Sequence, residues 1–389
     1  MPQNKVLHIV AFDVPFPADY GGAIDVFYRI KALKTLGYSI TLHVFEYGRG
    51  RQVALEELAT VIYYKRATSF INLFSRRPYI VQSRINQTLL NNLLHVDAPI
   101  LFEGLHTCYY LEHPKLAERC TMVRMHNIEH EYYGGLQAAH SFFKKLFFWL
   151  EKVKLKKYQV ILQKARYILA IKSSDQSFFQ QFHSNVFLLP ASIPPVNRLQ
   201  QPTKRYALFH GNLSVKENEN AALWLIHTLD SLLESDFPFV IAGKNPSLKL
   251  QHVCQEKGVQ LCINPTENEL NELIQQAHIH TLFSAMNTGI KLKLLACLGS
   301  SGHVLMNDQL LTGTDLDEFC QLANDEKAFK MHFIGLKNKV VSVETFQARQ
   351  KVLSEQFSTL ENCRLIEELV EKTNPPPRCL RTQMELSLE

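Results

Sequence analysis

The sequence predicts an α/β fold with two Rossmann-like domains, each built on a parallel sheet. Short apolar runs alternate with helix-type segments along most of the chain, which is the pattern of consecutive βαβ units. The 389 residues exceed one ordinary domain, and 46% hydrophobic residues are enough for two cores. A proline-rich stretch at residues 194–202 divides the alternation and is the best candidate for a linker.

The composition excludes several classes of protein. A net charge of +5 is mild and argues against a nucleic-acid partner. The eight cysteines are scattered without a C-x-x-C pair, as expected of reduced thiols in a cytoplasmic protein. The chain starts on a strand-like segment without a signal-peptide pattern, and no apolar run approaches the ~18 residues that a membrane span needs. We therefore expect a cytoplasmic location.

In the first half, a strand at residues 6–12 leads into a turn-rich loop and then a helix at 23–36. Gly21 and Gly22 lie at the end of that loop, where a ligand can approach bare backbone at a helix N-terminus. This pair is a candidate for substrate binding, and a simple turn is the alternative.

A second candidate follows the strand at 122–125. In open α/β sheets, side chains that contact ligands lie beyond the carboxyl ends of the strands. His126 and Glu129 are therefore placed to hydrogen-bond a polyol. A metal site from His126, Glu129 and His130 would need a helix starting at His126 and further ligands, which the sequence does not offer. We expect no metal.

Residues 142–166 form a long basic helix in which Phe, Trp and Leu alternate with Lys and Arg, and Glu151 is the only acidic residue. Such a helix suits an anionic membrane surface or an acidic partner helix. Contact with the membrane surface would make the protein peripheral on the inner face of the membrane. The alternative is a helix whose apolar stripe faces the core and whose basic back faces solvent.

The second half restarts the alternation with a strand at 206–209, a loop, and a helix from 219 with Asn218 as N-cap. The resulting domains are 1–195 and 203–343, followed by one closing helix at 344–372 and a loose tail at 373–389 that contains three consecutive prolines. Asp315 and Asp317 resemble a metal-binding D-x-D pair, but Thr314 with Asp317 fits a helix cap better.

A strand at residues 280–283 leads into residues 284–308, which read as a glycine turn, a helix and a second strand at 304–306. Asn287, Thr288 and Gly289 form the turn, and Lys291 and Lys293 fall in the first helical turn. Backbone N–H groups, the positive end of a helix dipole and ammonium groups at one place suit a diphosphate. A plain crossover with solvated lysines is the alternative.

The order of these motifs resembles the GT-B glycosyltransferases, and more narrowly the retaining family 4 group of bacterial enzymes. The resemblance covers nearly the whole chain through four stretches, at 17–23, 123–129, 210–224 and 288–295. It implies two domains facing each other across a cleft. It also implies metal-independent, retaining transfer of a sugar from a nucleotide sugar, a substrate and not a cofactor, to a glycan, polysaccharide-precursor or lipid-linked acceptor.

The resemblance also implies roles for the candidate residues. Lys291 and Lys293 would stabilise the charge on the departing diphosphate, and His126 would contact the donor sugar. The phosphate cradle would be completed by the backbone around Gly211, Asn212, Asn287, Thr288 and Gly289. Gly21 and Gly22 would pack against the phosphate or the acceptor. Lys216 would compensate for an arginine and a lysine that related enzymes often carry where this chain has Asn212 and Glu217.

Two departures from the family pattern leave other functions open. Related enzymes usually carry two glutamates around the helix that follows Gly289, and Thr288 and Ala296 occupy those positions here. One alternative is therefore a catalytically degraded GT-B scaffold that binds a nucleotide or a partner protein without turnover. A nucleotide-sugar epimerase on the same fold is a minor alternative.

Overall fold

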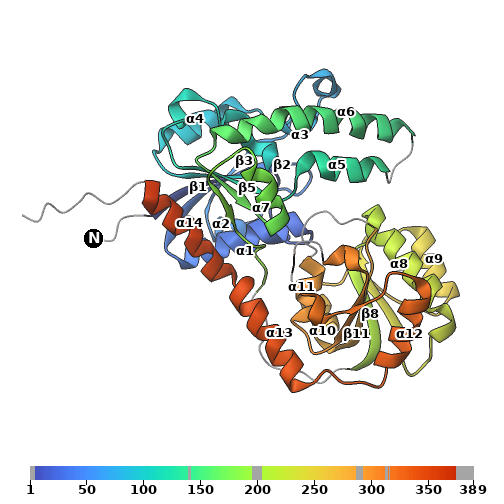
Figure 1. Cartoon of the computed structure of the whole chain (residues 1–389). Coiled ribbons are helices and arrows are strands. Elements are labelled where there is room, and N and C mark those ends of the chain that lie inside the picture. Colours follow the sequence, from blue (N-terminus) through green and yellow to red (C-terminus); the bar gives the residue numbers. More distant parts are fainter. Residues whose placement is uncertain are drawn as a thin grey trace, which may run out of the picture.

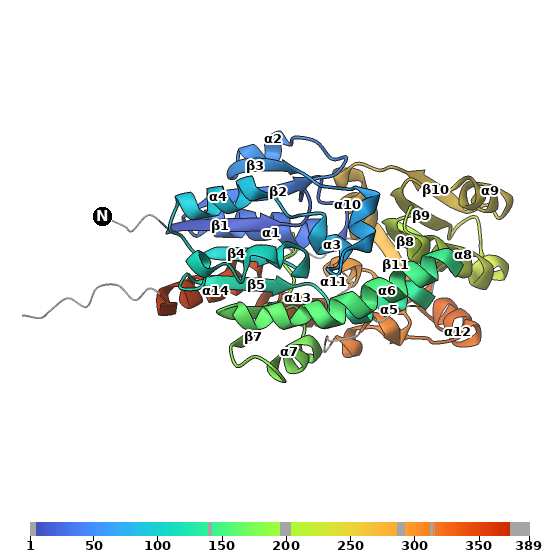
Figure 2. The ribbon, with the colours of Figure 1, turned by 90° about the horizontal axis from the view of Figure 1, so that it is seen from above.

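The computed structural model describes residues 5–138, 142–194, 204–285, 292–311, 314 and 316–373. These residues form two α/β domains, each around one parallel sheet, as predicted (Figure 1). Figure 2 shows the two domains side by side, with the N-terminal domain on the left and the C-terminal domain on the right.

The first sheet has seven parallel strands in the order β3-β2-β1-β4-β5-β6-β7. Their bounds are β1 (Lys5–Ala11), β2 (Tyr38–Glu46), β3 (Thr60–Lys65), β4 (Ile100–Glu103), β5 (Thr121–Met125), β6 (Tyr167–Ala170) and β7 (Val186–Leu188). β4, β5 and β6 are buried along their whole length, which is why most of their residues are apolar.

Helices cover both faces of this sheet. They are α1 (Gly21–Thr35), α2 (Val53–Glu56), α3 (Tyr79–Gln82), α4 (Gln87–His95), α5 (Glu129–Ala138), α6 (Phe142–Tyr158) and α7 (Ser173–Gln180), with short 3₁₀ turns η1 (Phe70–Phe74), η2 (Leu105–Tyr110), η3 (Pro114–Leu116) and η4 (Gln159–Lys164). One core lies under α4, α5 and α6, and the other lies under α1.

The second sheet has six parallel strands in the order β10-β9-β8-β11-β12-β13. The strands are β8 (Lys204–Asn212), β9 (Phe239–Lys244), β10 (Gln260–Ile263), β11 (Ala277–Leu282), β12 (His303–Met306) and β13 (Gln321–Leu322). The helical segments are α8 (Lys216–Leu229), η5 (Asp230–Leu232), α9 (Leu248–Glu256), α10 (Glu267–Gln276), α11 (Leu292–Leu298), η6 (Asp308–Leu310), η7 (Asp317–Phe319) and α12 (Glu326–Leu336).

The single closing helix expected at 344–372 is wrong, because the structure has two helices, α13 (Val343–Gln356) and α14 (Thr359–Thr373). Phe357 is buried in the core of the second domain, whereas Cys363, Ile366 and Leu369 of α14 are buried against the first domain. Each segment packs on a different domain, so the chain breaks between them, and the Ser358 side chain accepts a hydrogen bond from the Glu361 N–H. Within the described residues, no helix combines the length and apolarity needed to cross a membrane.

Candidate active site

The two domains meet through segments that follow the carboxyl ends of their strands. The Lys244 ammonium at the end of β9 lies 3.1 Å from the Asp19 carboxylate in the loop after β1. Asp19 also pairs with Arg49, which stacks over the Tyr20 ring. These two cations hold the pKa of Asp19 below its usual value although burial acts in the opposite direction. The loop that leads to Gly21 is therefore fixed by a charged contact from the other domain.

Gly21 and Gly22 form the first turn of α1, directly beside the second domain. A Cβ atom on Gly21 would lie 3.9 Å from Leu292 Cδ1 at the start of α11. A Cβ atom on Gly22 would lie 2.8 Å from Phe12 Cζ, so only glycine fits there without a shift. The Tyr20 side chain at the N-cap position makes no capping hydrogen bond to α1, and the first turn of the helix has no acidic residue. The N–H groups of this turn are suited to an anionic ligand.

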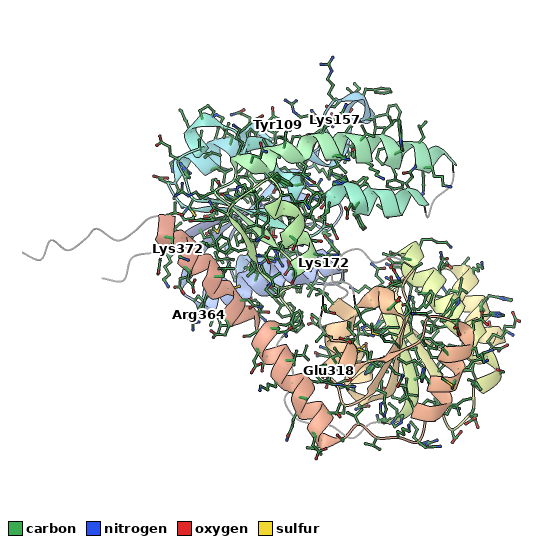
Figure 3. The ribbon with its side chains drawn as sticks, viewed as in Figure 1. Tyr109, Lys157, Lys172, Glu318, Arg364 and Lys372 are labelled. Atoms are coloured by element: carbon green, nitrogen blue, oxygen red, sulfur yellow. The ribbon has the colours of Figure 1, made fainter. Side chains whose placement is uncertain are left out.

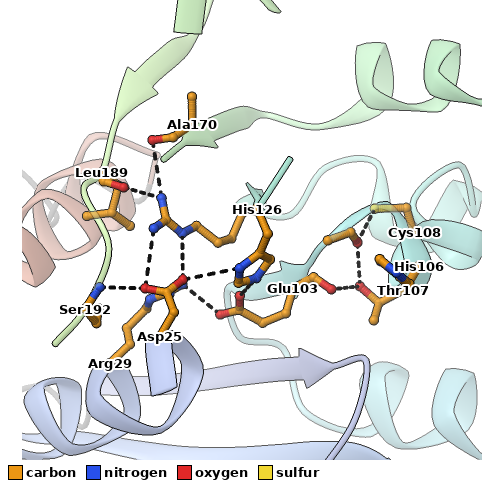
Figure 4. Close-up of polar contacts among 12 residues, drawn as sticks. Asp25, Arg29, Glu103, His106, Thr107, Cys108, His126, Ala170, Leu189 and Ser192 are labelled. Carbon is orange, nitrogen blue, oxygen red and sulfur yellow. Dashed lines mark hydrogen bonds and ion pairs between the residues drawn. The ribbon is translucent and has the colours of Figure 1, made fainter. Parts of the chain in front are cut away.

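His126 lies in a buried network of charged side chains (Figure 4). Its Nε2 atom is 2.9 Å from Glu103 Oε2, and its Nδ1 atom is 3.4 Å from Asp25 Oδ2. Both ring nitrogens therefore face carboxylates. A direct hydrogen bond from His126 to a sugar hydroxyl, the role that the sequence suggests, would require one of these contacts to be released.

Two arginines balance the two carboxylates around His126. Arg29 pairs with both Asp25 and Glu103, and Arg124 pairs with Asp25. The Ser192 N–H donates to Asp25 as well, over 2.6 Å. One carboxylate oxygen each of Asp25 and Glu103 and one ring nitrogen of His126 lie within 4.8 Å of one another, which is a spacing that could hold a metal ion. Because Arg29 and Arg124 already supply two positive charges to these carboxylates, we interpret the group as an ion network that orients His126.

Glu129 begins α5 and is buried, so it is not presented openly to a ligand. Burial raises the pKa of its carboxyl group to about 8, and the charge of Arg84 opposes this only in part. Its Oε1 atom is 3.9 Å from His106 Nδ1, and neither atom has a hydrogen-bond partner among the described residues. His130, the third residue of the metal hypothesis, contacts Gln159 over 3.2 Å.

On the second domain, Gly211 and Asn212 end β8 and face the start of α8. Asn218 is not the N-cap expected from the sequence, because α8 begins at Lys216. Its amide instead donates to the Asn212 carbonyl over 2.9 Å and accepts from Lys293 Nζ over 2.8 Å. A Cβ atom on Gly211 would lie 3.2 Å from Asn218, so the glycine leaves room for this bridge. Lys216 is more than half exposed and pairs with Glu219.

The structure thus brings the predicted residues to two places. The first group lies in the first domain, where His126 and Glu129 follow β5 and Gly21 and Gly22 follow β1. The second group lies in the second domain and consists of Gly211, Asn212, Lys216 and Lys293. Asn287, Thr288, Gly289 and Lys291 lie outside the described residues, as does Asp315. The helix cap expected from Thr314 is wrong, because its hydroxyl donates to the Leu311 carbonyl and η7 has no side-chain cap.

Sequence reasoning missed the residues that hold His126, namely Asp25, Arg29, Glu103 and Arg124. A signal for them was present, since Glu103 ends a buried apolar strand and Arg124 lies inside another. A charged side chain inside such a strand indicates a buried partner of opposite charge.

Comparison with solved structures identifies the fold as that of GT-B glycosyltransferases. A glycosyltransferase from Rickettsia africae aligns with 96% of this chain and 100% of its own, at a TM-score of 0.64 and 11% identity. Anabaena HepE, solved in complex with UDP, aligns with 95% of this chain and 100% of its own, at a TM-score of 0.63 and 11% identity. WaaG, a glycosyltransferase involved in lipopolysaccharide biosynthesis, aligns over the same shares at a TM-score of 0.61 and 12% identity.

Sequence comparison adds one curated relative. An uncharacterized 44.6 kDa protein in the cps region of Klebsiella pneumoniae is 24% identical over 358 residues, which cover 85% of this chain and 91% of the relative. No protein-family profile matches the chain. At these identities the likeness to solved structures establishes the fold and leaves the reaction to be argued from the site.

Proposed function

We propose that this protein is a retaining, metal-independent glycosyltransferase. It would move a sugar from a nucleotide sugar to a glycan, polysaccharide-precursor or lipid-linked acceptor. The observation that carries the proposal is the position of the N-terminus of α1, where the N-cap residue Tyr20 makes no side-chain capping bond. It lies where segments from the carboxyl ends of two parallel sheets meet, in a chain with a glycosyltransferase fold.

The chemistry of the donor explains why such a place is suitable. When the glycosidic bond breaks, negative charge develops on the nucleoside diphosphate, and a site without metal must stabilise it with cations and backbone N–H groups. The first turn of α1 supplies N–H groups, and Lys293 supplies a charge that the Asn218 amide orients. The UDP bound to HepE supports a nucleotide-linked donor.

The acceptor side of the proposal rests on the first domain. His126, the expected contact of the donor sugar, lies with its ion network at the carboxyl end of β5, and the acceptor would bind beside it in the first domain. WaaG acts in lipopolysaccharide biosynthesis, which supports a role in polysaccharide or glycolipid assembly for this chain. We place the protein in the cytoplasm, peripheral on the inner face of the membrane, with residues 142–166 toward the lipid.

A thermal-shift screen with UDP-, GDP- and ADP-linked sugars tests the donor. A ligand at about 100 times its Kd should stabilise the protein by roughly 2.7 kcal/mol. Lys293→Met should weaken the binding of the responding nucleotide about tenfold or more, since a charge-assisted contact contributes roughly 1.5–3 kcal/mol. Lys327→Met, at an exposed position of α12, is the matched control and should have no effect. Failure of all nucleoside diphosphates to bind would refute the proposal.

A measurement of the nucleoside diphosphate released from the bound nucleotide sugar then distinguishes an enzyme from a non-catalytic scaffold. The absence of glutamates at Thr288 and Ala296 motivates the scaffold alternative, which the glycosyltransferase neighbours do not favour. A scaffold would bind the nucleotide and release nothing. An enzyme should produce a glycoside whose anomeric configuration matches the donor, should keep its rate in EDTA, and should lose its rate in His126→Ala.

A further inference from the structure

We propose that the outer face of the first domain docks on an anionic phospholipid bilayer and holds a lipid phosphate in a basic hollow. We call this surface the bilayer face and define it as η1, residues 75–77 and the exposed side of α6. The inference rests on the proposed function, because it names the surface at which a lipid-linked acceptor would be met. Its test needs no sugar transfer, so the two can fail separately.

η1 presents large apolar side chains to solvent. Phe70, Ile71 and Phe74 are 71%, 77% and 76% exposed. Scattered single apolar residues are ordinary on a protein surface, but three within one five-residue turn form a patch that calls for a partner. The turn is well defined, because the Ser69 hydroxyl accepts from the Ile71 N–H and the two phenylalanine rings pack edge to face. It has the form of a small wedge.

α6 extends this patch with a second apolar stripe. Leu146, Trp149, Leu150 and Val153 follow the i, i+3, i+4, i+7 spacing of one helix face, and all four are exposed. Glu151 and Leu155 on the opposite face are buried, so α6 is apolar on two sides. One apolar side faces the core, as in the solvated-helix alternative, and the outer side carries these four apolar side chains as well as exposed lysines.

The wedge and the stripe belong to one surface. Lys154 Nζ on α6 donates to the Leu73 carbonyl of η1 over 2.9 Å, and the Tyr79 N–H donates to Glu151 over 2.6 Å. Figure 1 shows α6 along the edge of the first domain opposite α13 and α14. Figure 3 shows Lys157 and Tyr109 at this edge. Both elements can therefore contact one planar surface together.

Between them lies a hollow of about 490 Å³ with a basic lining. Its lining consists of Ser75, Arg76, Arg77, Lys154, Lys157 and Tyr158. The Tyr158 hydroxyl oxygen is buried and has no hydrogen-bond partner among the described residues. Arginine, lysine and hydroxyl donors around one cavity are the groups that bind phosphate.

The combination selects a bilayer over other partners. An interfacial helix places apolar side chains at the acyl boundary and lysines among the headgroups, and Trp and Phe prefer that depth. Lys144, Lys145, Lys156 and Lys157 are exposed along α6, and Glu151, its acidic residue, is buried beneath them. An acidic protein partner would pair with the lysines of α6 but would not bury the apolar side chains of η1. The anionic lipid surface accounts for both.

Co-sedimentation with vesicles tests the docking. The protein should bind phosphatidylcholine vesicles that contain phosphatidylglycerol and should not bind phosphatidylcholine alone. The triple variant Phe70→Ser, Ile71→Ser, Phe74→Ser should bind at least about tenfold more weakly because the wedge is lost. The variant Arg76→Gln, Arg77→Gln, Lys157→Gln should lose roughly 100-fold, at about fivefold for each basic side chain near the surface.

Matched controls on the second domain separate docking from general stickiness. Leu248, Met331 and Val340 are also exposed, and their triple serine variant should bind as the unchanged protein does. Lys249→Gln with Lys327→Gln and Lys351→Gln is the charge control. Thermal unfolding of every variant should remain unchanged, since all of these positions lie on the surface.

Fluorescence gives a second readout that reports the depth of α6. The chain has two tryptophans, and Trp224 stacks on Phe283 inside the second domain, so Trp224→Phe leaves Trp149 as the only reporter. Its emission should shift to the blue with phosphatidylglycerol vesicles and should not shift with polyglutamate or inorganic phosphate. Equal binding by the wedge variant, or a shift with polyglutamate that equals the vesicle effect, would overturn the proposal.

Discussion

Replacing Glu129 with glutamine should stabilise the protein increasingly as the pH rises. The folded protein holds a proton on this buried carboxyl with a pKa of about 8, whereas the unfolded chain releases it near its ordinary value of 4.5. A group whose pKa is raised on folding favours the folded state in acid and loses that contribution as the pH rises. The loss is about 1.4 kcal/mol per pH unit between the two values, or roughly 3 kcal/mol at pH 7.

Glu129→Gln keeps the shape of the neutral acid and removes this loss. The difference in unfolding free energy between variant and parent should grow by about 3 kcal/mol from near pH 5 to near pH 7 and level off above about pH 8. Urea unfolding at each pH measures it, and all other titrating groups cancel in the difference. Glu131→Gln, on an exposed position of the same helix, should give a flat line. A flat line for Glu129→Gln would refute the reasoning.

Three further predictions concern the fold around the site. Asp25→Asn should cost about 3–5 kcal/mol in urea unfolding, because it removes the charge that buried Arg29 and Arg124 share and leaves Arg29 with Glu103 alone. Although burial opposes it, the charges of Arg124 and Arg29 hold the pKa of Asp25 well below its usual range, so this contribution should persist above about pH 4 and fade only in stronger acid. Gly22→Ala should cost about 1–3 kcal/mol through its clash with Phe12, whereas Gly21→Ala should change stability by less than about 0.5 kcal/mol, and equal effects would contradict the geometry. Thr359→Val should cost about 1–2 kcal/mol because the hydroxyl bonds both backbone groups of Ile193, and an unchanged urea midpoint would show that this link contributes nothing.

The strands were the most predictable part of the structure. In a parallel sheet that is covered on both faces, the strands are mostly apolar runs, and residues 100–103, 121–125 and 167–170 have that form apart from Glu103, Thr121 and Arg124. The break between α13 and α14 was not predictable from helical periodicity. Both halves have helix-type patterns, and only tertiary packing sends Phe357 to one domain and Cys363 to the other.

The site was predictable only where its residues come from one segment. Gly21 and Gly22 were found because a loop and a helix start adjoin in the sequence. The network around His126 joins Asp25, Glu103 and Arg124, which come from three separate elements, and no local pattern records that they converge. For the same reason α6 left two interpretations open, since spacing shows that a helix has apolar faces but does not show which face the core uses.

The contacts between the domains explain where the molecule can move. At one end, Ile193 and Thr359 exchange two hydrogen bonds of 2.9 Å, which tie together the two places where the chain passes between the domains. Toward the start of α1, the domains are joined by Lys244 to Asp19 and by Tyr28 to Glu267, and the latter pair is exposed. Pairs in contact with solvent contribute at most about 1 kcal/mol each. A movement that separates the domains therefore breaks these weak links first and rotates the domains about the Ile193–Thr359 link. Such a rotation changes the distance between the start of α1 and Lys293, the two groups proposed to hold the diphosphate.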